Sequence, residues 1–269
     1  MAYVAYNNIR AFLSTGNDID TATGNDSVLY ATNFSATVNP QLKRVRRIGE
    51  ELDYYIQTGP KSSSISVTAI PVTGAGFNQF TSFLALTGDF VSGSFIRAMP
   101  YLWRKCYLKS MNFSIEPWKP MLLNMEFDSL GQSLGVAQLD SYPEQNLDTG
   151  IISPLRGMSI SLNNYTWPDQ VTQYESLNFS IEVERRPDWE IGNAFGTSRV
   201  GKITKTLQIN GISNWIQGLD YLPSETFNCT LTMADGNSFS VAGVLNSQNL
   251  SVDANGVAKG GLQIVEEMI

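Results

Sequence analysis

Apolar and polar residues alternate in short stretches along the whole chain of 269 residues. In the stretch 175–184, Phe179, Ile181 and Val183 are expected on one face and the residues between them on the other. A period of two residues is typical of a β-strand with one buried face. Further strands are predicted at 28–38, 64–71, 107–115, 122–129, 203–210, 244–252 and 261–267. The chain is therefore predicted to be mainly β.

The chain also repeats itself. Three pairs of similar segments occur in the same order: NFSATVN from 33 and NFSIEVE from 178, the Ile-Gly pairs at 48–49 and 191–192, and LKSMNFSIEP from 108 and LNSQNLSVDA from 245. The numbering offset between partners falls steadily along the chain, from 145 through 143 to 137. Small deletions in the second copy explain this drift, and the shared order indicates an internal duplication.

Each copy predicts the same succession of elements. A first strand leads into a long polar excursion (41–63 and 185–202), and a Ser/Thr-rich strand returns. A short helix (77–87 and 214–221), a hairpin and a closing strand pair follow. In the second copy, Asp235-Gly236 is a strong signal for a tight hairpin turn. We predict two tandem antiparallel β-sandwich or barrel domains, 1–133 and 134–269, each with one short helix and one long loop.

The residue content removes most catalytic and metal chemistry. The chain has no histidine, which is the commonest general base and metal ligand. Its two cysteines, Cys106 and Cys229, have no ligand-like spacing; two buried free thiols are favoured over a disulfide. Carboxylate pairs such as Glu50 and Glu51 are sequence neighbours, which point opposite ways on a strand, and no glycine-rich phosphate loop occurs. We expect a protein that is not an enzyme and has neither cofactor nor metal.

The charge balance is acidic, with 25 Asp and Glu against 18 Lys and Arg. A protein that grips nucleic acid by its phosphates needs a basic footprint, so such binding is not expected. The start MAYVAYNNIRAFLSTG lacks the pattern of a signal peptide, and no apolar run approaches the ~20 residues of a membrane span. We expect a protein made in a cytoplasm and not bound to a membrane.

The order of these elements resembles the tail tube protein family of long-tailed bacterial viruses, which is shared with the inner tubes of contractile injection machines. The resemblance rests on the first strand, the excursion with Ile-Gly and then Gly59-Pro60-Lys61 or Gly201-Lys202, the returning strand and the closing pair. It implies a ring-forming virion protein whose rings stack into a tube for the passage of DNA. The implied partners are further copies of the chain and other tail proteins: the baseplate, the tail terminator and, in contractile tails, the sheath.

The duplication is a departure from family members that have one tube domain per chain and form sixfold rings. A duplicated chain resembles members in which three subunits imitate a hexamer. It equally resembles baseplate hub or tube-initiator proteins that bridge the tube to a threefold spike. A duplicated carbohydrate-binding β-sandwich is the alternative from another class, in which tryptophans serve as stacking platforms for sugars.

Charged residues of both signs concentrate in the two excursions. They are Lys43, Arg44, Arg46, Arg47, Glu50, Glu51 and Asp53 in the first copy, and Arg185, Arg186, Asp188 and Glu190, with Trp189, in the second. A mixed-charge loop that recurs in both copies favours a docking element between rings or subunits. The alternative is a solvated loop whose charges balance. Nucleic-acid binding is disfavoured because no aromatic residues interleave with the basic ones of 43–47.

Two further sets of residues are candidates for function. The polar strand faces Ser35, Thr37, Asn39, Ser180, Glu182 and Glu184 line the bore or face solvent outside the ring, and the pattern leaves both open. The apolar segment with Trp118, Met121 and Leu122 has a polar counterpart at 255–260, so we predict a subunit contact there. The other tryptophans are expected in the core or at subunit interfaces, with sugar binding as the alternative.

Overall fold

A computed structural model of the chain contains one 13-stranded sheet and a separate two-stranded hairpin. It describes residues 11–14, 27–39, 42–46, 48–49, 53–57, 62–70, 94–98, 101–116, 119, 121–131, 133–135, 159–162, 174–191, 196–212, 226–232, 238–252 and 258–268. These ranges contain strands and no helix, hence no helix able to span a membrane. The prediction of a mainly β, antiparallel protein is confirmed. The two predicted helices, 77–87 and 214–221, lie outside the described residues.

The strands divide between the two halves of the chain. The first half contributes β1 (Ala11–Ser14), β2 (Ser27–Asn39), β3 (Leu42–Arg46), β4 (Asp53–Gln57), β5 (Ser62–Ile70), β6 (Ser94–Ala98), β7 (Tyr101–Ile115), β8 (Leu122–Ser129) and β9 (Ser133–Gly135). The second half contributes β10 (Ser159–Leu162), β11 (Tyr174–Asp188), β12 (Thr197–Ile212), β13 (Thr226–Thr232), β14 (Ser238–Val252) and β15 (Ala258–Met268). Each strand predicted from the alternation overlaps one of these.

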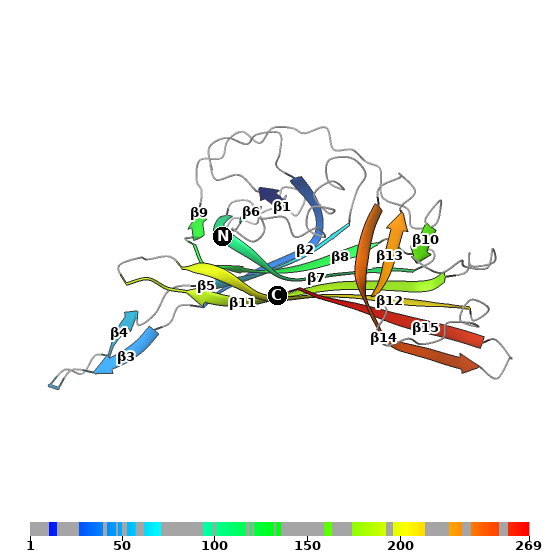
Figure 1. The fold of residues 1–269 in the computed structure, drawn as a ribbon. Helices are drawn as coiled ribbons and strands as arrows, with labels where there is room; N and C mark the ends of the chain where they lie inside the picture. Colours follow the sequence, from blue (N-terminus) through cyan, green and yellow to red (C-terminus); the bar gives the residue numbers. More distant parts are fainter. Residues whose placement is uncertain are drawn as a thin grey trace.

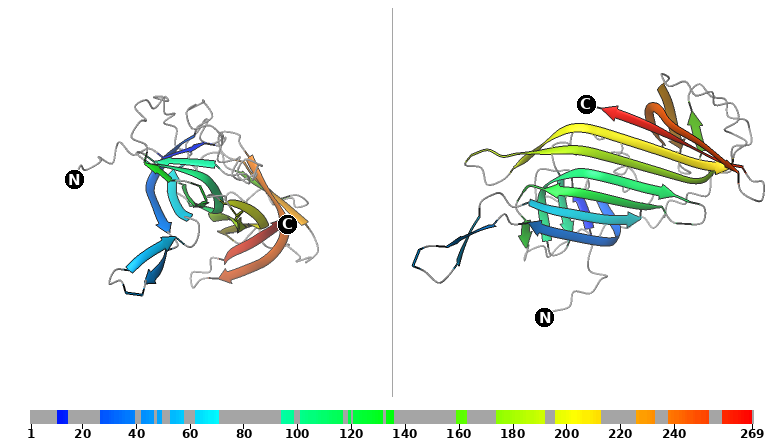
Figure 2. Two further views of the ribbon diagram at one scale, coloured as in Figure 1. Left: turned by 90° about the vertical axis from the view of Figure 1, so that its left-hand side faces the viewer. Right: turned by 90° about the horizontal axis from the view of Figure 1, so that it is seen from below.

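Eight long strands form one continuous layer, in the order β2-β5-β8-β7-β11-β12-β15-β14. Each half contributes four of them, and β7 and β11 join the halves. This layer lies across the lower part of Figure 1, and it is seen face-on in the right-hand view of Figure 2. The left-hand view shows that the strands follow an arch and not a flat plane. The long layer is therefore shared by both halves.

Shorter strands cover one face of this layer. β1, β6 and β9 lie over the first half, and β10, β13 and the start of β14 lie over the second half (Figure 1). β7 belongs to both layers, because its residues 101–106 pair with β6 while 110–115 pair with β11. The strand turns near Lys105, whose φ of 51° is in the left-handed region. The apolar side chains between the layers form a single core that runs through both halves.

The order of strand pairing is the same in the two halves. The first half pairs as β1-β6-β7-β8-β5-β2 and the second as β10-β13-β14-β15-β12-β11. The β7–β8 hairpin of the first half and the β14–β15 hairpin of the second half carry a register shift at the same place. It lies between Leu108 and Ser110 in β7 and between Leu245 and Ser247 in β14. The offset between these two places equals that of the last pair of sequence repeats, which begins at the same two leucines. In the first half β1 also pairs with β2, so that six strands form a closed circuit.

The two polar excursions are β-hairpins, whereas we predicted loops. In the first half β3 pairs with β4, and in the second half the ends of β11 and β12 pair with each other. The pair Val45–Tyr54 corresponds to the pair Asp188–Thr197. The residue numbers of both members differ by 143, which is also the numbering offset between the two Ile-Gly pairs. The first turn contains Gly49, whose φ of 90° favours a residue without a side chain.

One anchor of the predicted repeat is displaced by two residues. Asn112 and Asn249 hold the same place in the last pair of repeats. In the first half Asn112 pairs with Asn124, Asn124 with Thr68, and Thr68 with Asn33. In the second half Asn249 pairs with Gly261, Gly261 with Asn210, and Asn210 with Ser176. Asn33 therefore corresponds to Ser176 and not to Asn178, with an offset of 143 instead of 145. The error has a physical cause: a shift of two residues along a strand leaves every side chain on the same face.

Candidate functional site

The second face of the eight-stranded layer is open and polar. Register partners form one row across seven strands: Ser35, Ser66, Glu126, Ser110, Glu182, Thr204 and Glu267. The opposite faces of the same strands carry the core, for example Ile65, Phe127 and Ile181. The open face thus displays hydroxyl and carboxylate groups on a scaffold that the core holds in place.

A neighbouring row of this face is held together by side-chain hydrogen bonds. The Thr68 hydroxyl donates to Asn124 Oδ1 at 2.9 Å, and the Asn124 amide donates to Asn112 Oδ1 at 3.0 Å. On a different row, in the second half, the half-buried Asn210 amide donates to Ser176 Oγ at 2.9 Å. Such bonds between exposed groups contribute little to stability, but they fix amide and hydroxyl groups in a regular pattern over the face.

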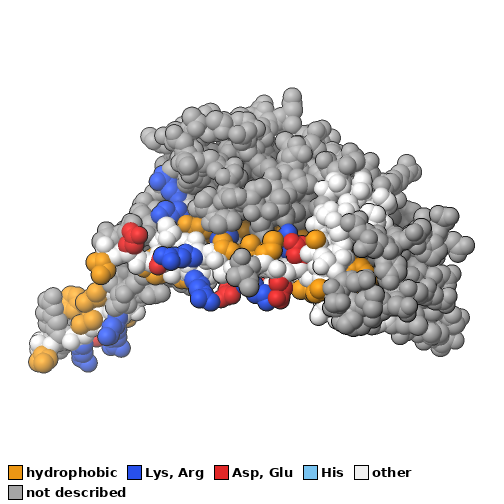
Figure 3. All heavy atoms as spheres, in the orientation of Figure 1, with side chains coloured by type: hydrophobic (Ala, Val, Ile, Leu, Met, Phe, Trp, Pro, Cys, Tyr) orange, Lys and Arg blue, Asp and Glu red, His pale blue; other side chains and the backbone are white. Residues whose placement is uncertain are grey.

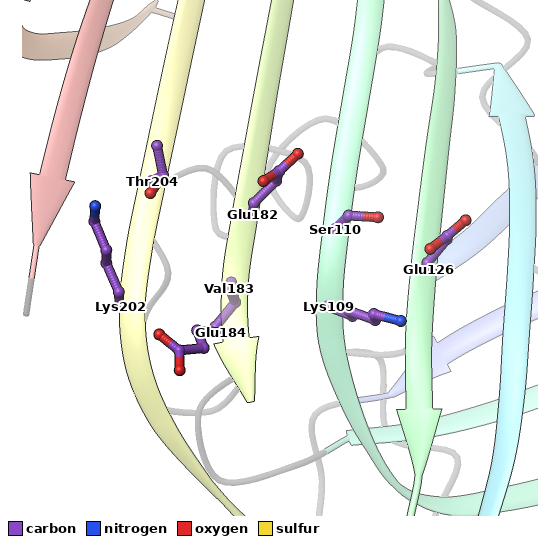
Figure 4. Close-up of a pocket in the computed structure, with 8 residues that line it drawn as sticks. All are labelled: Lys109, Ser110, Glu126, Glu182, Val183, Glu184, Lys202 and Thr204. Atoms are coloured by element: carbon purple, nitrogen blue, oxygen red, sulfur yellow. The ribbon is translucent and has the colours of Figure 1, made fainter. Parts of the chain in front are cut away.

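A hollow of about 370 Å³ lies on this face where the two halves meet. Figure 4 shows its lining on four adjacent strands: Lys109 and Ser110 on β7, Glu126 on β8, Glu182, Val183 and Glu184 on β11, and Lys202 and Thr204 on β12. Three carboxylates stand against two ammonium groups, and Lys202 Nζ is 2.5 Å from Glu267 Oε1 at its edge. The described part of the chain holds no cluster of carboxylate and thiol groups that could bind a metal ion. The hollow is therefore a mildly acidic depression with no metal-binding arrangement.

The joint between the halves is the β7–β11 pair, which runs from Ile115–Leu177 to Ser110–Glu182. On its core side, the rings of Phe113 and Phe179 pack with centroids 5.2 Å apart and planes tilted by 35°. At one end, Arg185 donates from Nε to the Leu108 carbonyl oxygen at 2.8 Å, and its guanidinium lies 5.4 Å from the Tyr107 ring centroid. The joint is thus sealed by packed rings and by a guanidinium that bridges the two halves.

Burial governs the ionisation of the groups at this end of the joint. It lowers the pKa of Arg185, and the neighbouring Tyr107 and Asp128 partly offset this shift. Burial also raises the pKa of the Tyr107 hydroxyl. The guanidinium keeps its charge at any physiological pH because its unperturbed pKa is far above 7. Arg185, one of the residues predicted for a docking element, contacts β7 of the other half within the single chain.

The eight-stranded layer ends in two edges, β2 on one side and β14 on the other. β5 occupies one side of β2 residues 30–39, while β15 occupies one side of β14 residues 244–252. Among the described strands, none pairs with the other side of residues 34–39 or 247–252. Within the described part of the chain, these two edges therefore present unpaired backbone donors and acceptors, which can template pairing with another chain.

Apolar side chains are exposed along the hairpin that continues one of these edges. The β3–β4 hairpin projects from the body at the lower left of Figure 1, and Figure 3 shows apolar and basic side chains side by side on it. Its exposed apolar residues are Leu42, Ile48, Tyr54, Tyr55 and Ile56. Arg44 pairs with Asp53 across the two strands. A contiguous apolar and basic surface of this kind is typical of a contact site.

The corresponding hairpin of the second half contacts the first half, where Lys105 Nζ donates to the Gly196 carbonyl oxygen at 3.5 Å. Arg186 pairs with Glu184, and Arg199 pairs with Asp188 at 2.5 Å. Trp189 packs over Gly196, where any β-carbon would lie 2.5 Å from the indole ring. Glu190 is exposed, and Ile191 at the tip is fully exposed, as is its counterpart Ile48. The predicted residues of both excursions therefore lie on hairpins; Arg47, Glu50 and Glu51 are outside the described residues.

The predicted face residues occupy the open face. Ser35 and Thr37 on β2 are exposed, as are Glu182 and Glu184 on β11, and Ser180 is half-buried between them. Asn39 ends β2, and its side chain lies outside the described part. Sequence reasoning did not identify the contributions of β5, β7, β8 and β12 to the same face. Their alternation was visible, but the strand order that brings them together was not.

The predicted subunit contact at residues 118–122 divides between two environments. Met121 is buried in the core, so it is not available for a contact, whereas Leu122 is exposed on the open face. Trp118 lies outside the described residues. Trp103 is buried against Phe34, with centroids 5.3 Å apart, as expected for core packing. Tyr101 starts β7, while residues 167 and 215 are not described.

Both cysteines are free and buried, as predicted. Cys106 lies in β7 in the first half, and Cys229 lies in β13 in the second. Burial raises the pKa of each thiol from 9.0 to about 12. Thiols that stay protonated at neutral pH are poor nucleophiles, so both act as small apolar core residues.

Comparisons with known proteins add no identity to this geometry. No protein-family model matches the chain, and no curated protein matches it.

Proposed function

We propose that the chain is a ring-forming structural protein of a viral tail, built from two tandem tube-like β domains that derive from a duplication. The order of strand pairing, the shared register shift and the matched hairpins support the duplication. The halves share one core, so they act as one rigid unit with two similar surfaces. Copies of this unit form the inner tail tube of a long-tailed bacterial virus, located in the virion tail.

One observation carries the proposal: the two halves of the chain are joined strand to strand in a way that copies of the chain could repeat. β7 of the first half and β11 of the second half join two four-stranded sheets into a single arched layer. The outer strands, β2 and β14, are the counterparts of β11 and β7 and lack that partner among the described strands. Repeating the same joint between chains adds copies with constant curvature, which closes into a ring if the rotation per copy fits.

The size of such a ring suits a conduit for DNA. Three copies supply 24 strands, which at about 4.8 Å spacing and a tilt of about 40° give a backbone diameter of roughly 48 Å. Side chains would leave a bore of about 35–40 Å, wider than a DNA duplex of about 20 Å. The closed ring would also leave no free edge in the layer.

The open face has the chemistry of a lining that does not hold DNA. Its rows consist mainly of Ser, Thr, Asn and Gln, and in the hollow the carboxylates of Glu126, Glu182 and Glu184 outnumber the ammonium groups of Lys109 and Lys202. Negative groups repel phosphates, and uncharged hydroxyl and amide groups offer only weak contacts. We place this face in the bore and the core-covered side on the outside.

Negative-stain electron microscopy of the purified protein over a concentration series tests the proposal. We expect rings with threefold or pseudo-sixfold symmetry, and hollow tubes at high concentration. Rings that never stack would favour a tube-initiator or baseplate adapter of the same fold, with about three to six copies per virion. A strict monomer that neither assembles nor joins a complex with other tail proteins would overturn the proposal and favour a binding module.

A further inference from the structure

The β7–β11 joint shows which partner strand is missing at the free edges of β2 and β14. Residues 34–39 of β2 are the counterparts of 177–182 in β11, and residues 247–252 of β14 are the counterparts of 110–115 in β7. Val38 is 45% exposed, whereas its counterpart Ile181 is completely buried by β7 and the core. The exposure of Val38 therefore marks the place where a strand equivalent to β7 is missing.

We propose that β14 of one copy pairs antiparallel with β2 of the next copy in the register of the internal joint, so that Ser35 lies opposite Ser251, Thr37 opposite Asn249 and Asn39 opposite Ser247. The three pairs follow from Asn178–Ser114, Ser180–Asn112 and Glu182–Ser110 in the β7–β11 ladder. This inference rests on the proposed function and adds the partner strand, the direction and the register.

The end of the proposed joint between copies has different side chains from the end of the β7–β11 joint within the chain. The counterparts of Arg185 and Tyr107 are Leu42 and Val244. Leu42 is 53% exposed and Val244 is 45% exposed in the single chain, where Leu42 begins β3 just after the edge residues of β2 and Val244 precedes the edge residues of β14. In the proposed register they meet, so an aliphatic contact between copies takes the place of the guanidinium on the tyrosine ring.

The faces of the strands agree with this register. Ser35 and Thr37 are exposed on the open face, as is Asn249, so their pairing continues the polar rows from one copy to the next. A shift of one residue would turn the polar row of one copy toward the core of its neighbour. A shift of two residues would keep the faces but separate Leu42 from Val244. The register proposed is the one that satisfies both conditions.

Paired cysteines test the register in the full-length chain. In the variant Thr37→Cys with Asn249→Cys, the two thiols lie at opposite edges of one chain, so a disulfide between them links different copies. Directly opposed residues of antiparallel strands have Cα atoms about 4.5–5.5 Å apart, which is within the range that a disulfide bridges. The matched control is Thr37→Cys with Ser251→Cys, which is displaced by two residues. Native Cys106 and Cys229 are buried and do not interfere.

We expect mild oxidation of assembled protein to convert the first variant mainly to linked dimers and trimers, and to leave the control mostly unlinked. Circular dichroism and electron microscopy are recorded for both variants before oxidation. If either variant misfolds, Ser35→Cys with Ser251→Cys and its control Ser35→Cys with Asn249→Cys replace them.

The outcomes separate the register from the proposed function. Rings in which the control links and the first variant does not would overturn the register while the ring proposal stands. Rings in which neither variant links would show that β2 and β14 do not pair. Absence of both rings and links from correctly folded protein would overturn the proposed function together with this inference.

Discussion

The covered β7–β11 joint and the free edges of β2 and β14 are built from corresponding residues but differ in what those residues are. The joint has Phe179 and Ile181 on its core side, where the free edge of β2 has Ala36 and Val38. At its end, the joint has Arg185 over Tyr107, where the free edges have Leu42 and Val244. The joint thus contains the larger side chains and the buried charge.

This difference follows from when each surface meets its partner. The internal joint forms once, during folding, so it can bury large rings and a guanidinium with fixed hydrogen bonds. In the proposed assembly, the edges of β2 and β14 would stay in water until a second copy binds. The small Ala36 between the polar Ser35 and Thr37 keeps the apolar area of this stretch low, which limits uncontrolled pairing.

The largest effect is expected for truncation in the covered joint. Ile181→Ala removes a completely buried side chain and should lower the free energy of unfolding by about 2–5 kcal/mol. Its counterpart Val38→Ala should change it by no more than about 0.5 kcal/mol, because the side chain is half in water. Urea unfolding at concentrations where sedimentation shows single chains measures both. Equal losses would mean that β2 is already covered in the single chain.

A smaller effect is expected for the bridging guanidinium. Arg185→Ala removes the hydrogen bond to the Leu108 carbonyl and the contact with Tyr107, and should cost about 1–3 kcal/mol. The neighbour Arg186 forms an exposed ion pair with Glu184, so Arg186→Ala should cost at most about 0.5 kcal/mol. The same unfolding experiment applies to both. A loss for Arg186→Ala that equals the loss for Arg185→Ala would contradict the bridging role.

The sequence predicted the strands well because each is a local pattern. Alternation in the segment with Phe179, Ile181 and Val183 reports which side of a strand is buried, and no distant residue is needed to see it. The order of the strands depends on contacts between distant segments. Nothing near Ile181 indicates that β7, which belongs to the other half of the chain, lies beside it, so the open face could be named only in part.

The excursions show a second limit of the sequence. Charges of both signs, as in Lys43, Arg44 and Asp53, look like a solvated loop, yet a hairpin with both faces exposed has the same composition. The role of Arg185 was missed for a related reason. A single arginine in a charged segment gives no signal that it will reach across to the carbonyl of a distant strand.

A still smaller effect on the fold, but a complete effect on assembly, is expected at the free edges. Leu42→Asp places a charge where the proposed contact with Val244 forms, while the side chain is exposed in the single chain. The free energy of unfolding should change by at most about 0.5 kcal/mol, whereas rings should no longer form. Ser66→Asp is the control: it adds the same charge at an exposed position of the open face and should leave rings intact. Both are compared by sedimentation velocity. Rings formed by Leu42→Asp would exclude this residue from the contact.

The smallest perturbation leaves the sequence unchanged and uses the two thiols as reporters, one in each half. Both have a pKa of about 12 in the folded chain, against 9.0 for an ordinary thiol, so neither should react with a thiol reagent at pH 8 until its surroundings open. Because the halves share one core, the opening that exposes Cys106 and the opening that exposes Cys229 should have the same free energy. The labelling rate of each thiol in low denaturant, followed by peptide mass spectrometry, measures this free energy.

Ile181→Ala sharpens this comparison, because a weakened joint should let the two halves open separately and give the two thiols different labelling rates.

The pH dependence of the free energy of unfolding gives a further check. Unfolded thiols ionise near 9 and folded ones near 12, so the thiols favour folding below about pH 9, and this contribution is lost as the pH rises toward 12. Different rates at Cys106 and Cys229 in the unaltered chain would show that the β7–β11 joint does not bind the halves into one unit. The internal joint would then be an unsuitable template for a joint between copies.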